Sequence, residues 1–170
     1  MSRRQVTLAI AVAAIGFLIA AAFSQRWFIA DLGFGPITAK VRIGLTSLRV
    51  CGTNGLASGC EEVAWKEVSH GSGTMWMWIG RLIFALTLIT AVVLVVLAAR
   101  ASGRVDLGLP VSLPRVIMRL TLAAVPLCSF YYLFAPSAIS TTMEVGRGFL
   151  FGFLGFVLAA SAAWPELEYD

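Results

Sequence analysis

Four long apolar runs dominate the chain, and each is long enough to cross a lipid bilayer as an α-helix. A spanning helix needs about 20 apolar residues, because the hydrocarbon core is about 30 Å thick and a helix rises about 1.5 Å per residue. The hydrophobic fraction of 59% also exceeds the range of about 45–50% that is typical of soluble domains. The sequence therefore predicts an all-α membrane protein, a four-transmembrane-helix bundle forming one membrane domain over residues 1–170, with spans at residues 6–25, 75–99, 115–134 and 146–164.

The first run has a competing interpretation as a cleaved signal peptide. Arg3 and Arg4 precede it, and three alanines at residues 20–22 could mark a cleavage site. A retained helix is the preferred interpretation, because the apolar run is longer than a usual signal core. Trp27 and Phe28 follow the run and are predicted to anchor the helix at the membrane–water interface.

Charge suggests the orientation of the chain. The spans are joined by an outer loop (residues 26–74), an inner loop (100–114) and an outer turn (135–145), and a tail (165–170) follows the last span. Arginines that flank one side are retained in the cytoplasm, and here they are Arg3, Arg4, Arg100, Arg104, Arg115 and Arg119. Both termini of this multi-pass protein are therefore predicted to be cytoplasmic, in a plasma or bacterial inner membrane. The net charge of +4 is too small and too scattered to indicate nucleic-acid binding.

The outer loop contains the clearest β signal. Cys51 and Cys60 flank a loop that carries Asn54-Gly55, a dipeptide typical of hairpin turns, so two antiparallel strands closed by a disulfide are predicted. The alternative is two free thiols, which is less favoured on the oxidising side of a membrane. Apolar residues change phase near Thr46 and Ser47, and a β-bulge is predicted there.

Small residues recur at helical spacing in the first and last spans. Such faces let helix backbones approach closely, and they comprise Ala9, Ala13, Gly16 and Ala20 in one span and Gly148, Gly152, Gly155 and Ala159 in the other. Packing within the bundle is the preferred interpretation, with packing between protomers as the alternative.

Residue patterns typical of catalysis are scarce. The single histidine, His70, lies in a glycine- and serine-rich loop, and no cluster of histidines or cysteines has metal-ligand spacing. Cys128 lies within the third span and is interpreted as a packing residue. A thiol oxidoreductase needs a Cys-x-x-Cys pair and a second exchanging pair, which the chain lacks. We therefore expect no enzyme activity and no cofactor.

Arg81 lies near the outer end of the second span, where an unpaired guanidinium is costly. Two interpretations remain open. The side chain either extends to the interface or pairs with Glu144 or with carbonyl groups of the outer loop, and a paired arginine is predicted.

The order of these features resembles the claudin and peripheral myelin protein superfamily in its wider sense. The shared signature is a tryptophan, a Gly-Leu pair, two cysteines and an arginine, which correspond here to Trp27, Gly44, Leu45, Cys51, Cys60 and Arg81. The resemblance implies a four-helix bundle that carries a small antiparallel extracellular β-sheet. It also implies a protein that acts through lateral or head-on contacts rather than through catalysis.

The loop has more apolar side chains than a two-stranded ribbon can bury against itself. Some of them must pack on the outer helix ends, on extra strands between Trp27 and Lys40, or on a partner. The predicted interaction surface comprises Ile43, Leu45, Val63 and Trp65. The favoured function is therefore a structural or adhesion role, through self-association or contact with other membrane proteins. The alternative is a small accessory subunit of a larger membrane transporter, channel or respiratory complex.

Overall fold

Four long helices form the body of the protein. The computed structural model describes residues 3–34, 37–54, 57–64, 72–103, 112–134 and 143–167. Within these ranges the helices are α1 (Arg3–Ala22), α3 (Ser72–Ala101), α4 (Leu113–Leu133) and α6 (Arg147–Leu167). Each contains a stretch that is long and apolar enough to cross a membrane, which confirms the prediction of four helices of this kind.

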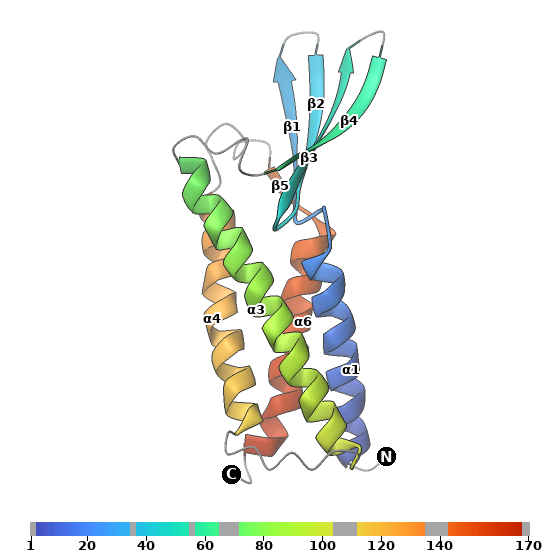
Figure 1. The fold of residues 1–170 in the computed structure, drawn as a ribbon, viewed down its shortest axis with the longest axis vertical. Coiled ribbons are helices and arrows are strands. Elements are labelled where there is room, and N and C mark those ends of the chain that lie inside the picture. Colours follow the sequence, from blue (N-terminus) through green and yellow to red (C-terminus); the bar gives the residue numbers. More distant parts are fainter. Residues whose placement is uncertain are drawn as a thin grey trace.

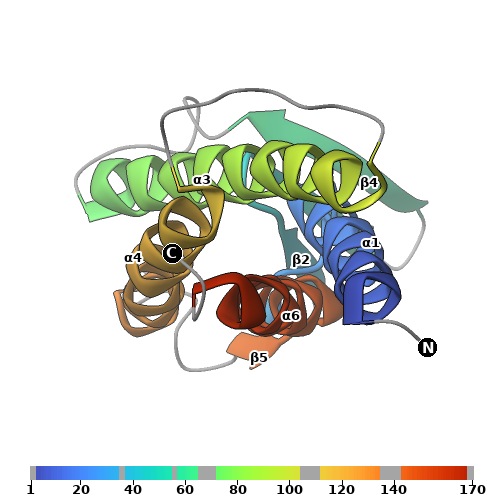
Figure 2. The same cartoon turned by 90° about the horizontal axis from the view of Figure 1, so that it is seen from below.

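The helices form a ring in which each one packs mainly against two neighbours. α1 packs against α3 and α6, and α4 packs against the same two helices (Figure 2). Buried threonines inside the ring, such as Thr87 and Thr121, donate their hydroxyl hydrogens to the carbonyl oxygens of Ile83 and Ile117 one turn earlier. A polar group in an apolar interior is thus satisfied by its own helix.

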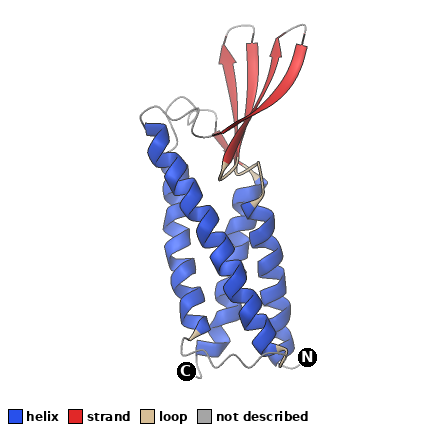
Figure 3. Cartoon of the chain, in the orientation of Figure 1, coloured by secondary structure: helices blue, strands red, loops and turns tan. Residues whose placement is uncertain are grey.

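A five-stranded antiparallel sheet rises from one end of the bundle (Figures 1 and 3). The strands are β1 (Phe28–Phe34), β2 (Ile37–Ile43), β3 (Ser47–Asn54), β4 (Ala57–Ala64) and β5 (Met143–Val145). Their spatial order is β4-β3-β2-β1-β5. α1 begins and α6 ends at the opposite end of the bundle from the sheet (Figure 1).

The predicted bulge near Thr46 is wrong, because the chain reverses direction there. β2 ends at Ile43, and the Gly44 N–H donates to the Ser47 carbonyl oxygen at 2.9 Å to close a tight turn. Ile43 then lies opposite Leu48. Residues opposite one another point to the same face of a sheet, so the change of apolar phase in the sequence reflects this turn.

Two further boundaries differ from the sequence prediction. α1 ends at Ala22 rather than at residue 25, and the chain that follows turns to begin β1. The outer turn between α4 and α6 contains β5, which pairs with Phe28–Ala30 of β1. A strand of three residues has too little alternation to be recognised from its sequence alone.

Candidate interaction surface and its anchor

Trp27 fastens the sheet to the bundle. Its side chain is fully buried, and its indole Nε1–H donates to the Ala21 carbonyl oxygen at 2.6 Å. The indole lies against Gly148 and Gly152 of α6, where an added Cβ would come within 2.7 and 2.8 Å of the ring atoms. Trp27 and Phe28 are therefore core residues, and the prediction that they anchor the chain at the membrane interface is wrong.

Tyr131 of α4 joins the same cluster from the other side. Its hydroxyl donates to the Gly44 carbonyl oxygen at 3.0 Å, and its ring stacks on Trp76 with a centroid separation of 4.7 Å. The Trp76 indole N–H in turn donates to the Tyr131 carbonyl oxygen. Phe28 also contacts the tyrosine ring. Side chains from α3, α4 and β1 thus meet in one buried aromatic cluster, which ties the sheet to both helices.

The Gly44-Leu45 turn docks directly on α3. Leu45 is buried, and its carbonyl oxygen lies so close to Gly80 that a Cβ at this glycine would approach it to 2.7 Å. The same Cβ would lie 3.2 Å from the Tyr131 ring. The Gly-Leu pair therefore acts in packing the sheet on the helix.

The predicted apolar interaction surface is largely buried within the protein. Ile43 and Leu45 are inaccessible to solvent, so the prediction that they contact a partner is wrong. Ile43 lies opposite both Phe28 and Leu48, and these apolar side chains share the core at the base of the sheet. Val63 is half-buried, and Trp65 lies outside the described residues.

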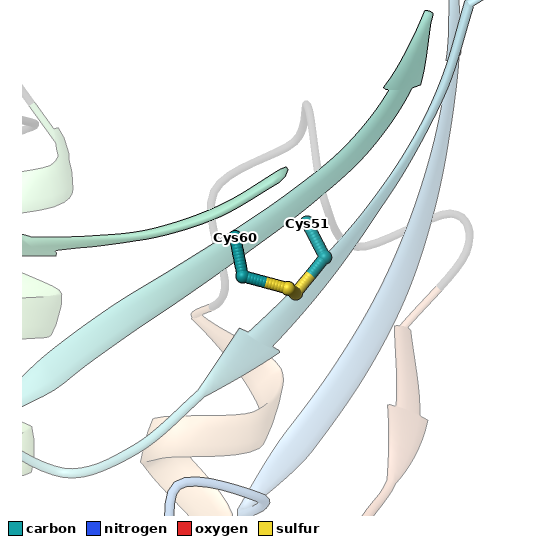
Figure 4. Close-up of a disulfide and its surroundings, with 2 residues drawn as sticks. All are labelled: Cys51 and Cys60. Carbon is teal, nitrogen blue, oxygen red and sulfur yellow. A yellow bond between two sulfur atoms is a disulfide. The ribbon is translucent and has the colours of Figure 1, made fainter. Parts of the chain in front are cut away.

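The predicted disulfide is confirmed. Cys51 of β3 and Cys60 of β4 lie directly opposite one another and are bonded, with their Cα atoms 4.1 Å apart (Figure 4). Cys128 is a free, buried cysteine in α4. Gly55, which belongs to the predicted hairpin turn, and His70 lie outside the described residues.

The disulfide also shows which way the backbone of β4 points. Opposed residues of antiparallel strands alternate between two kinds of pair. In hydrogen-bonded pairs the Cα atoms are about 5.5 Å apart, and in pairs that exchange no hydrogen bonds they are about 4.5 Å apart. At 4.1 Å, Cys51 and Cys60 form a closer pair. The Gly44–Ser47 hydrogen bond leads to the same result. The backbone groups of Ser47 point toward β2, and so do those of every second residue after it along β3, which include Cys51. The N–H and C=O groups of Cys60 and Glu62 therefore point away from β3, toward the open edge of the sheet.

We expect alkylation to label two thiols only after reduction. In unfolded protein without reductant, a maleimide should label Cys128 alone, and reductant should add Cys51 and Cys60. Loss of the bridge should lower the free energy of unfolding by about 2–3 kcal/mol, because the bond restricts the unfolded chain. Labelling of all three thiols without reductant, detected by mass spectrometry, would contradict the assignment.

Arg81 lies on the outside of α3 over an aromatic ring. Its guanidinium carbon is 5.3 Å from the centroid of Trp78, at a cation–π distance. Within the described ranges no ion pair joins it to Glu144, so the predicted salt bridge is wrong. The reason is topological. Glu144 belongs to β5, which leads directly into α6, and α3 and α6 lie across the ring from one another (Figure 2).

The two small-residue faces have different surroundings. Gly148, Gly152 and Gly155 are buried against the chain between α1 and β1 and against α1 itself, and a Cβ at Gly155 would lie 2.8 Å from the Leu18 side chain. Ala9, Ala13, Gly16 and Ala20 instead point out of the bundle, and no atom lies within 4 Å of the Cβ position of Gly16. Their predicted packing within the bundle is wrong, because α1 turns a different face inward, formed by Thr7, Ala11, Ala14, Leu18 and Ala21.

Sequence reasoning missed a group of arginines at the base of the sheet. Arg26, Arg42, Arg49 and Arg147 line one open cavity of about 380 Å³. They come from four separate places in the chain, so no local motif brings them together. The only available signal was that basic residues occur in the loop predicted to lie outside, where acidic residues nearly balance them.

Among the described residues, no three His, Cys, Asp or Glu side chains gather where they could hold a metal ion. In comparisons with known proteins, no protein-family model and no curated protein matches the chain.

Proposed function

We propose that the protein is a non-enzymatic integral membrane protein that acts through protein–protein contacts of its disulfide-linked sheet, in a claudin-like structural, adhesion or assembly role. The observation that carries the proposal is the open edge of β4. This strand ends the sheet, and its outward N–H and C=O groups at Cys60 and Glu62 have no strand beyond them in the described sheet. An edge of this kind can accept a strand from another chain.

The side chains of β4 indicate the chemistry of the partner. Glu61 and Glu62 are both exposed on this edge. Two copies paired antiparallel through β4 would bring these carboxylates together, and like charges on facing strands are destabilising. The edge therefore favours a strand with basic side chains from a different membrane protein.

Three features make the sheet suitable for docking. The aromatic cluster around Tyr131 holds its base, the Cys51–Cys60 bond joins its two outermost strands at that edge, and the turn at Gly44 rests on α3. A rigid surface loses less conformational entropy on binding than a mobile one. The resemblance of this loop to the claudin and peripheral myelin protein superfamily supports the same role.

The proposed orientation has both termini in the cytoplasm and the sheet outside. It rests on the arginines near the sheet-distal ends of the helices, such as Arg4, Arg115 and Arg119, and on a disulfide that persists in oxidising compartments. Alkylation supplies the check. On intact cells or spheroplasts, an impermeant reductant followed by an impermeant maleimide should label Cys51 and Cys60, and an absence of label would reverse the orientation.

The alternative function is an accessory subunit of a larger transporter, channel or respiratory complex. The outward face of α1 favours it, because Ala9, Ala13 and Gly16 offer another helix a close approach. Strict copurification with one large partner would support this alternative. Homo-oligomers formed by the chain expressed alone would support a self-assembling structural role.

Glu62→Pro is expected to reduce partner capture strongly while leaving the protein folded. Proline has no N–H, and at Glu62 the lost N–H is one that points to the open edge rather than to β3. The matched control is Glu62→Thr, which removes the same charge and keeps the N–H. Crosslinking in native membranes, followed by quantitative mass spectrometry of the captured proteins, should show partner loss of about tenfold for proline relative to threonine.

Glu61→Pro tests the direction in which the backbone N–H groups of β4 point. The N–H of Glu61 points toward β3, so proline there should weaken the sheet itself and lower the melting temperature in detergent. If Glu62→Pro and Glu62→Thr capture equal amounts of every partner, the edge of β4 is not the docking site.

A further inference from the structure

The arginine cavity lies where the bundle meets the sheet. Its walls come from the chain that follows α1, from the paired strands β2 and β3, and from the first residue of α6. The guanidinium-bearing residues are Arg26, Arg42, Arg49 and Arg147. The cavity measures about 380 Å³ and is open on one side, which is room enough for a phosphate group and the atoms attached to it.

These four cations are arranged unfavourably for an empty site. Arg42 and Arg49 lie directly opposite one another on β2 and β3, and like charges in that arrangement destabilise a sheet. Repulsion from Arg147 and then from Arg42 lowers the pKa of Arg26 below its ordinary value. The positive charges therefore act on one another across the cavity.

Among the described residues, the carboxylates in the row of Arg42 and Arg49 form no ion pair with these arginines. Glu62 lies opposite Arg49, and Glu144 lies two strands away from Arg42, with Ile29 between them. Asp31 is bonded to Lys40 instead. Within the described ranges, none of the four guanidinium groups forms an ion pair or a hydrogen bond with another residue.

The position of the cavity indicates where an anion would come from. It lies level with the end of α1 and the start of α6, and because both helices are apolar enough to cross a membrane, their ends on this side would lie at the depth of the lipid headgroups. Phe23, which also lines the cavity, is 69% exposed and gives the site an apolar wall at the end of α1. The positive end of the α6 dipole lies at Arg147 and adds to the attraction for an anion.

We propose that Arg26, Arg42, Arg49 and Arg147 bind a phosphate group, supplied by the headgroup of a phospholipid in the leaflet on the sheet side. Guanidinium groups suit this ligand, because their planar N–H pairs match two phosphate oxygens at once. The bound phosphate removes the mutual repulsion of the arginines, and the lipid glycerol and acyl chains extend past Phe23. This inference is independent of the partner that β4 engages.

The test uses the full chain, purified and delipidated in a neutral detergent. Three probes are titrated separately: dioleoyl phosphatidylglycerol, inorganic phosphate, and dioleoylglycerol, which has the same acyl chains without phosphate. Binding is measured by native mass spectrometry and by the shift in melting temperature. The parent should bind phosphatidylglycerol and not dioleoylglycerol.

The variant Arg42→Gln/Arg49→Gln should weaken binding of phosphatidylglycerol by about tenfold or more, since hydrogen bonds to charged groups are among the stronger ones. The matched control is Lys40→Gln. It removes a positive charge from the same strand and the same face, two residues from Arg42 and outside the cavity lining, and it should bind like the parent. Without any anion, the double variant should melt at or above the parent's temperature, because a repulsion has been removed.

The probes also separate the two sources of phosphate. If millimolar inorganic phosphate displaces the lipid and stabilises the parent equally, the site binds phosphate itself; if it does neither, the lipid headgroup is the ligand. The proposal is overturned if the parent and the double variant bind lipid and phosphate equally well. It is also overturned if Lys40→Gln loses as much lipid binding as the double variant. Should the double variant fail to fold, Arg147→Gln takes its place, because it removes a positive charge from the cavity without changing the sheet. The same binding results are expected of it.

Discussion

Gly146→Ala is expected to unfold the protein or to lower its free energy of unfolding by about 3–5 kcal/mol. A Cβ at this position would overlap the backbone carbonyl group of Arg26 and would lie 3.1 Å from the Trp27 carbonyl oxygen. The Gly146 N–H and the Gly148 N–H donate to the Trp27 and Arg26 carbonyl oxygens, each at 2.8 Å. No flexible side chain can move aside there, so both hydrogen bonds between the start of α6 and the start of β1 must lengthen.

Gly16→Ala is the matched control for this substitution. Gly16 lies inside α1, and an added Cβ meets no atom within 4 Å. Because glycine is a poor helix former, alanine there should leave stability unchanged or raise it by about 0.5–1 kcal/mol. Unfolding of both variants is followed by circular dichroism in the same detergent. If Gly146→Ala melts with the parent, α6 does not approach the Arg26 backbone as closely as described.

Trp27→Ala should lower the free energy of unfolding by about 3–5 kcal/mol, the usual range for removing a large aromatic side chain from a core. The indole is fully buried, fills the space over Gly148 and Gly152, and packs edge-on against Tyr131 with ring centroids 6.4 Å apart. Its loss also leaves the Ala21 carbonyl oxygen without the indole N–H donor.

Two further variants make the measurement specific. Trp164→Ala removes the same side chain from α6 where it is 61% exposed, and its cost should be small by comparison. Trp27→Phe keeps an aromatic ring without the N–H donor and should fall between the parent and Trp27→Ala. Equal stability of Trp27→Ala and Trp164→Ala would show that the tryptophan does not anchor the sheet.

The arginines show most clearly where sequence reasoning reached its limit. Each of Arg26, Arg42, Arg49 and Arg147 was visible as a charge near the predicted outer side. Their convergence depends on the turn at Gly44, which brings Arg49 opposite Arg42, and on β5, which brings the start of α6 to the start of β1. Neither contact has a local pattern. The same limit applies to Ile43. The alternating pattern around it predicts one apolar face of a strand, but it does not indicate which part of the molecule covers that face.

The amino-acid sequence by itself determined the four spans and the Cys51–Cys60 pair, because both follow from local chemistry. A run of about 20 apolar residues has few alternatives to a membrane helix, and two cysteines around a short hairpin turn face one another. Tertiary structure alone decided that Trp27 and Leu45 are core residues, that the small-residue face of α1 points outward, and that four arginines share a cavity. Those outcomes depend on which face each helix turns inward and on which distant segments pair as strands. The arrangement adopted minimises the free energy of the whole chain rather than of any one segment.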